Sequence, residues 1–241
     1  MYRQFTIILS FITFASLGQS SIGLRMFGWQ YSSLSDAQSL YQNSSWPYEA
    51  KGYAGFLIGP TTRFQLKNQH YLTVELLFSM KGQTSQYETG TVDGFRVLDL
   101  SNGRETTARF SKNYSIHYFE VPMLYTIDLS HKSENARTHV SFSSGFSAGF
   151  NIAATLTENT YNASSFSAFL TAKTTETTVS DIKSLTMNFI SDLEVEFRRH
   201  KKARYFGFFR YAKQLGSAFQ NSSHSFGSFA FGFGMRWSLK K

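Results

Sequence analysis

Acidic and basic side chains are the residues of this chain best suited to do chemistry, and they recur among small polar residues in alternating segments. Six of them form the candidate site: Glu75, Glu120, Glu194, Arg25, Arg210 and Arg236. A carboxylate in a low-dielectric interior must be paired or protonated, so this pattern predicts an interior network of salt bridges. Arg210 is the expected partner of Glu75 and Glu120. Further candidates occupy equivalent positions of the alternation, among the small polar residues: Glu196, Arg63 and Arg198.

A catalytic alternative lies near the end of the chain, where His224 stands in a run of serines. The neighbouring hydroxyls belong to Ser222, Ser223 and Ser225. A serine beside a histidine is typical of a hydrolase, so a lipid-modifying hydrolase is the alternative function. Serine is abundant in this segment, however, and the sequence places no acid that would orient the histidine. We therefore expect a protein that is not an enzyme.

Metal and cofactor sites receive no support from the sequence. The remaining candidate histidines are isolated: His70, His117 and His139. No pair of them has the spacing of metal ligands within one element, and the chain has no Cys. We expect neither a metal nor another cofactor.

The elements that must position the charged residues are strands. Over residues 224–239 large apolar side chains alternate with small residues and one arginine, Arg236. A period of two is typical of a β-strand. The large phase comprises Phe229, Phe231, Phe233, Met235, Trp237 and Leu239. A large apolar face behind a small polar one favours a transmembrane barrel strand with lipid outside and a narrow lumen inside.

The same alternation predicts eight strands. They cover residues 22–31, 52–66, 71–87, 114–129, 138–155, 185–199, 203–215 and 224–239. Pro60 cannot donate to a ladder, so we expect an irregularity there. The connections alternate between long and short, and the long ones are 32–51, 82–112, 156–184 and 216–223. Residues 82–112 carry both acidic and basic side chains, and we expect this segment to fold back as a hairpin. Long external loops and short periplasmic turns are typical of outer-membrane barrels.

These observations predict an all-β, eight-stranded, antiparallel, transmembrane up-and-down β-barrel. A soluble lipocalin-type barrel also has eight strands, but it would need the charged phase outside and too many large side chains in a small lumen. The narrow lumen also argues against a solute channel, which leaves a proton path or small pore as the alternative to a salt-bridge network.

The beginning of the chain resembles a secretory signal. Arg3 precedes thirteen mostly apolar residues, 5–17, which are too few for a spanning helix of roughly 20 residues. Small residues precede Gln19 and predict cleavage near Gly18. We therefore assign residues 1–18 to a signal peptide and 19–241 to the barrel domain, and we expect Sec export to the bacterial outer membrane.

Composition agrees with this class. Aromatic residues make up 17% of the chain, whereas its mean hydropathy is only −0.25. The net charge of +8 comes from scattered basic residues, so we expect no nucleic-acid partner. The expected partners are outer-membrane lipid and lipopolysaccharide, together with proteins of an envelope or secretion complex.

Two strand motifs resemble those of the PorT-type outer-membrane β-barrel family of Bacteroidetes. Residues 71–82 read YLTVELLFSMKG and are similar to that family's third strand, and residues 118–125 read YFEVPMLY and are similar to another strand. The Phe209–Tyr211 segment before Leu215 and the Gly-x-Gly of the last strand are also similar. The resemblance implies an eight-stranded barrel in the outer membrane of a Gram-negative bacterium. It leaves the role open, since only some members of the family serve type IX secretion.

We therefore expect a non-enzymatic structural or interaction component of the outer membrane, within a secretion (type IX-like) or envelope assembly.

Overall fold

The computed structural model describes residues 20–35, 49–89, 91–92, 95–96, 108–130, 138–163, 170–198, 203–220 and 223–239. Its strands are β1 (Ser20–Leu34), β2 (Glu49–Lys67), β3 (His70–Glu75), β4 (Leu77–Thr89), β5 (Thr91–Val92), β6 (Phe95–Arg96), β7 (Ala108–Asp128), β8 (Thr138–Ala163), β9 (Leu170–Thr178), β10 (Leu185–Arg198), β11 (Ala203–Leu215) and β12 (Phe226–Ser238). A helix long and apolar enough to cross a membrane is not found among the described residues. The predicted signal peptide, residues 1–18, lies outside them.

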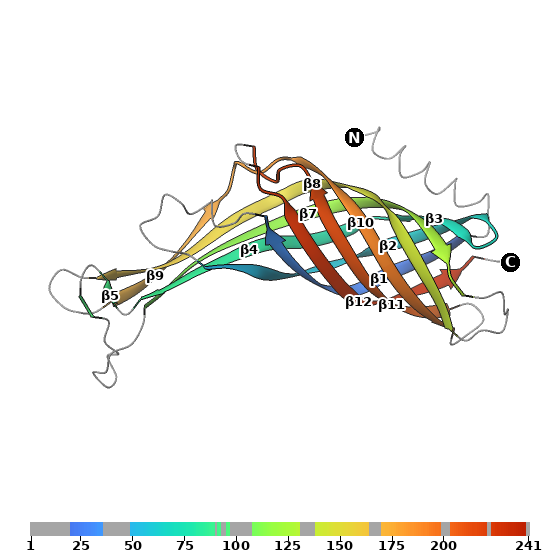
Figure 1. Ribbon diagram of the computed structural model, residues 1–241, viewed down its shortest axis with the longest axis horizontal. Helices are drawn as coiled ribbons and strands as arrows, with labels where there is room; N and C mark the ends of the chain where they lie inside the picture. The colour runs from blue at the N-terminus through green and yellow to red at the C-terminus, as the bar shows by residue number, and fades with distance from the viewer. Residues whose placement is uncertain are drawn as a thin grey trace.

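The strands close into a barrel (Figure 1). β1 pairs antiparallel with both β2 and β12, and β7 pairs with β8, which joins the two ends of the sheet. β3 and β4 run between β2 and β7 along one path, broken at Leu76, and together act as one strand. The described ring is therefore β1-β2-β3/β4-β7-β8-β10-β11-β12. This confirms the predicted eight-stranded antiparallel barrel.

The two phases of each strand face opposite sides, as the alternation predicts. Phe231 is 60% exposed and Met123 and Phe146 are each 54% exposed, whereas the inward Ser147 and Thr126 are buried. The exposed large apolar residues on β8 run from Phe142 to Ile152, which matches the roughly 9–11 residues that a tilted strand needs to cross a bilayer.

A bulge in β1 changes which residues face inward. The pairing with β12 shifts between Arg25 and Phe27, and both Met26 and Phe27 are exposed. An extra residue in one strand moves all later side chains to the opposite face. Gln30 and Ser32 beyond the bulge are consequently buried in the lumen. The irregularity expected at Pro60 lies opposite the break at Leu76, whose N–H donates to the Pro60 carbonyl oxygen.

The lumen also contains large apolar side chains that the alternation did not predict. Phe206 and Phe208 of β11 are buried, and they pair in register with Gly234 and Gly232 of β12. A Cβ on Gly234 would meet the Phe206 ring, and a Cβ on Gly28 of β1 would meet the Phe208 ring, so these two glycines leave the space that the rings fill. Other buried apolar residues of the inner wall include Leu57, Leu77, Leu124 and Ile190.

Two predicted connections are largely strand. β8 continues to Ala163 and β9 pairs with its second half, from Thr155↔Thr178 to Ala163↔Leu170, so the expected loop 156–184 is wrong over most of its length. β4 and β7 likewise pair as far as Thr89↔Ala108, inside the expected connection 82–112. These segments are rich in Thr, whose branched Cβ favours strands. In Figure 1 they project as a sheet far beyond the barrel, at the end opposite the short turns.

Candidate functional site: an interior charge network

The centre of the network joins one arginine of β1 and one of β11 to two carboxylates. Arg25 Nη2 lies 2.7 Å from Glu75 Oε1 and 2.5 Å from Asp192 Oδ2. Arg210 Nη2 lies 2.7 Å from Glu75 Oε2 and 2.6 Å from the same Asp192 oxygen. All four side chains are at most 4% exposed. Two cations therefore balance two anions.

A second group lies toward the end of the barrel where β1 begins. Arg236 Nη1 lies 2.6 Å from Glu194 Oε1 and 2.7 Å from Glu196 Oε2. Arg63 Nη2 is 3.0 Å from Glu194 Oε1, and Arg204 Nη1 is 2.6 Å from Glu196 Oε1. Three arginines thus surround two glutamates. Arg25 Nη2, 3.9 Å from Glu194 Oε2, connects this group to the central one.

Glu120 belongs to a separate pair. Its Oε1 lies 2.6 Å from Lys81 Nζ and accepts a 2.7 Å hydrogen bond from Ser79 Oγ. The expected partner, Arg210, instead contacts Glu75 and Asp192. The reason is register: Glu120 pairs with Leu77 across β4 and β7, which places the inward Ser79 and Lys81 of β4 next to it.

Strand geometry explains how the sequence assembles these groups. Asp192, Glu194 and Glu196 occupy every second position of β10 and therefore point into the lumen together. Arg210 lies opposite Asp192 in the β10–β11 register. Asp192, Arg204 and Lys81 are network members that the candidate set lacked. Their signal was available, because all three lie on the inward phase of predicted strands. The side chain of Arg198 lies outside the described part of the chain.

Aromatic rings complete the walls of the network. The guanidinium carbon of Arg25 lies 4.2 Å from the ring centroid of Phe208, and that of Arg236 lies 4.6 Å from the centroid of Phe206. A guanidinium over an aromatic face is attracted by the ring's quadrupole. The two phenylalanines therefore hold the arginines in place as well as fill space.

An apolar cluster fills the other end of the lumen, on the side of the projecting sheet. Ile182 and Phe219 form an isolated β-bridge between the segments that precede β10 and β12. Both are buried against Leu34, Tyr118 and Phe226. Charge network and apolar cluster together occupy the lumen with side chains, as an eight-stranded barrel requires.

The serine-rich segment around His224 contacts the residues that follow β1 and the segment that precedes β12. His224 is buried; its Nδ1 lies 3.0 Å from the Ser35 carbonyl oxygen, and its ring meets Phe219 edge to face. Ser222 lies outside the described residues, and Ser225 N–H donates to Ser35 Oγ. The hydrolase alternative stays a prediction.

His70 and His139 contact different neighbouring side chains. His70 Nδ1 is 2.6 Å from the Tyr125 hydroxyl, and His139 Nδ1 is 3.4 Å from Asp128 Oδ2. Within the described ranges, no three His, Cys, Asp or Glu side chains form a group that would hold a metal ion.

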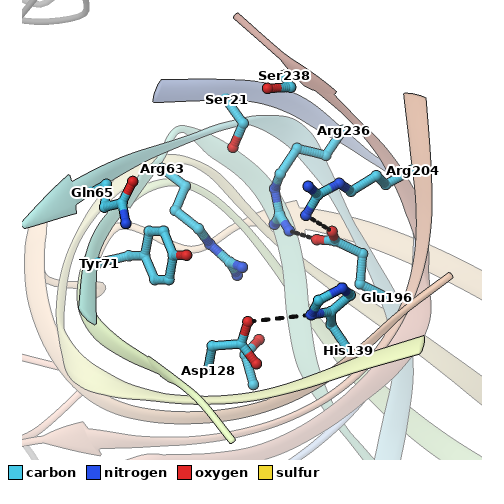
Figure 2. A pocket seen from close by; sticks show the side chains of 11 residues that line it. Ser21, Arg63, Gln65, Tyr71, Asp128, His139, Glu196, Arg204, Arg236 and Ser238 are labelled. Carbon is cyan, nitrogen blue, oxygen red and sulfur yellow. Dashed lines mark hydrogen bonds and ion pairs between the residues drawn. The ribbon is translucent and has the colours of Figure 1, made fainter. Parts of the chain in front are cut away.

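A polar cavity opens beside the second group of the network (Figure 2). It has a volume of about 120 Å³, and Arg63, Arg204, Arg236 and Glu196 form part of its wall. In Figure 2, His139 lies beside Glu196, and Asp128 faces the arginines from below.

Three solved barrels are similar to this chain over most of its length. The match to the Neisserial surface protein A covers 91% of this chain and 97% of that protein, at 8% identity and a TM-score of 0.43. The match to OprG from Pseudomonas aeruginosa covers 93% of this chain and 97% of OprG, at 10% identity and a TM-score of 0.44. The match to Ail of Yersinia pestis covers 91% of this chain and 99% of Ail, at 11% identity and a TM-score of 0.35.

The family relationship rests on the sequence itself. No curated protein matches the chain. The sequence model described as the outer membrane protein beta-barrel domain matches residues 17–220, which include β1 to β11. The chain therefore belongs to the outer membrane protein β-barrel domain family.

Proposed function

We propose that this protein is a non-enzymatic structural or interaction component of the bacterial outer membrane. Its barrel serves as a sealed anchor, and its working surface is the projecting sheet of β7, β8 and β9. An envelope or secretion assembly, such as the type IX machinery that some members of the PorT-type family serve, is the setting we infer for it.

The length of β8 is the observation that carries this proposal. The strand has 26 residues, whereas roughly 9–11 suffice to cross a bilayer. Its second half pairs with β9 on one side and with the start of β7 on the other, from Ser111↔Asn159 onward. An anchor alone needs no such extension, so a sheet continuous with the barrel wall favours a surface held at a distance from the membrane.

β9 gives this surface a means of binding. It is the last strand of the sheet, so its outer edge has no strand partner among the described residues. Residues 174–178 read TTETT and are all exposed. An exposed edge with β-branched side chains and a single charge accepts an extended segment of another protein as an added strand. We therefore infer a protein partner that binds by strand addition.

Photo-crosslinking in intact cells tests the proposal. A photoreactive residue replacing Glu176 on β9 should give a discrete crosslinked product, which mass spectrometry of the detergent-solubilised complex identifies. The matched control replaces the exposed Asn68, which lies in the short turn between β2 and β3 at the opposite end of the barrel.

The crosslinked products decide whether the protein belongs to an assembly. A specific envelope protein captured at position 176 and absent at position 68 supports the assembly role. Recovery of the uncrosslinked barrel alone from both variants, at stoichiometric purity, contradicts it.

A further inference from the structure

The polar cavity lies at the end of the barrel where β1 begins. It differs from the rest of the lumen because side chains do not fill the space between its charged groups. It holds about 120 Å³, enough for several water molecules. Short turns lie at this end, which places it on the periplasmic side of an outer-membrane barrel. In Figure 2, Arg63 and Tyr71 approach from one wall, and Glu196 and His139 lie on the other.

Nitrogen atoms already surround the carboxylates of this cavity. Glu196 Oε1 lies 2.6 Å from Arg204 Nη1, and its Oε2 lies 2.7 Å from Arg236 Nη1. Asp128 Oδ1 accepts a 2.9 Å hydrogen bond from Ser130 N–H, and Oδ2 faces His139 Nδ1 at 3.4 Å. Each carboxylate oxygen on the wall therefore has a nitrogen neighbour.

The donors of the cavity, in contrast, are in surplus. Arg236 Nε and Arg204 Nε are buried atoms that have no hydrogen-bond partner within the described part of the chain. Both ring nitrogens of His139 are buried without a hydrogen bond as well, since the contact with Asp128 does not have the geometry of one. Guanidinium groups donate five hydrogen bonds and accept none, and an unmade buried bond costs free energy.

The charges around the cavity are balanced. Arg63, Arg204 and Arg236 stand on the wall with Glu196 and Asp128, and Glu194 pairs with both Arg63 and Arg236 behind it. The surplus is therefore one of N–H donors. A ligand that only accepts hydrogen bonds matches this surplus, whereas a cation or an apolar molecule would leave the N–H groups unpaired.

We propose that this cavity is a binding site for a small oxyanion, such as phosphate or a phosphate monoester, at the periplasmic end of the barrel. The site is independent of the projecting sheet on the other side of the membrane. Arg204 controls access to it, because its side chain is 30% exposed at the rim while that of Arg236 is 3% exposed behind it.

Calorimetric titration of the mature barrel, folded in detergent at constant ionic strength set with chloride, tests the proposal. Inorganic phosphate should bind saturably to one site. Arg204→Gln should weaken binding about tenfold, the usual effect of removing one hydrogen bond to a charged group. Arg204→Lys retains a cation for Glu196 but lacks the Nε–H donor, so it should also bind more weakly. The matched control is Lys112→Gln, which removes one charge from the 2.9 Å pair with Glu158 on the projecting sheet.

Glycerol 3-phosphate, titrated separately, distinguishes the source of the anion. Tighter binding of inorganic phosphate identifies a free periplasmic anion, and tighter binding of the ester identifies a phospholipid headgroup. Saturable binding of neither compound overturns the proposal, as does equal weakening in Arg204→Gln and Lys112→Gln. Heat-modifiable gel mobility shows that each variant is folded, and Arg204→Lys supplies the test if Arg204→Gln is not.

Discussion

Arg25 Nη2 lies 2.7 Å from Glu75 Oε1, although the two residues are 50 positions apart in the chain and β2 separates their strands. The same nitrogen lies 2.5 Å from Asp192 of β10. One guanidinium thus joins three strands that are not paired with one another. The lumen is held together by contacts across it, in addition to the hydrogen bonds around its wall.

Glu120→Gln should destabilise the folded barrel. The change leaves Lys81, whose Nζ lies 2.6 Å from the Glu120 carboxylate, as a buried charge without its anion. Loss of one partner of a buried pair costs about 3–5 kcal/mol. Urea unfolding of the barrel in lipid vesicles, followed by heat-modifiable gel mobility, measures this.

The identity of the rescuing substitution tests the pairing. Adding Lys81→Met to Glu120→Gln should recover much of the lost stability. Adding Arg210→Met instead should cost further stability, because Arg210 holds Glu75 and Asp192. Rescue by Arg210→Met and not by Lys81→Met would show that the charges are paired differently.

Phe231→Arg should block folding into bilayers. Phe231 is 60% exposed on the outer face of β12, and arginine near the bilayer midplane costs about 2–4 kcal/mol in such barrels. Phe231→Leu, which keeps an apolar side chain, is the matched control. Normal heat-modifiable mobility of Phe231→Arg after vesicle refolding would mean that this face does not meet lipid.

Two glycines on neighbouring strands should respond differently to alanine. A Cβ on Gly232 would meet the carbonyl oxygen of Phe27 inside contact distance, whereas a Cβ on Gly207 would lie 3.8 Å from its nearest neighbour, the Gly232 carbonyl oxygen. Gly232→Ala should therefore lower the free energy of unfolding by about 1–3 kcal/mol. Gly207→Ala should leave it nearly unchanged, and similar urea midpoints for both variants would refute the expectation.

Cleavage near Gly18 remains a prediction from the sequence. The mature protein should begin at or close to Gln19 and should fractionate with the outer membrane, because a short apolar segment behind Arg3 is typical of a signal. N-terminal sequencing of the protein from purified outer membranes checks this. Retention of Met1 in a cytosolic protein is the opposite result.

The regular alternation made the barrel predictable from the sequence, because inward and outward residues differ in kind on strands such as β8 and β12. The bulge between Arg25 and Phe27 was not predictable, since an extra residue in β1 shows only through the pairing of β1 with β12 and β2. Phe206 and Phe208 also escaped prediction, because room for them depends on glycines of two other strands, Gly234 of β12 and Gly28 of β1.

The site was predictable as a set of charges and not as a set of pairs. The inward phase of the alternation was enough to identify Glu75, Glu194 and Arg236 as interior charges. Which cation meets which anion depends on register and on distances across the lumen, and neither is encoded in local spacing. Glu120 shows this best, since its partner Lys81 lies on the adjacent strand β4.

The position of the arginines on β11 and β12 has a consequence for assembly. β10 presents Asp192, Glu194 and Glu196 to the lumen, and their nearest cations include Arg204 and Arg210 of β11 and Arg236 of β12. An open sheet that lacks these last two strands therefore carries an excess of negative charge on the inner face of β10. Closure of β12 onto β1 brings that charge close to neutrality, and a closing strand displaced along β1 would leave carboxylates unpaired. Electrostatic neutrality inside the lumen thus distinguishes the completed barrel from a misaligned one.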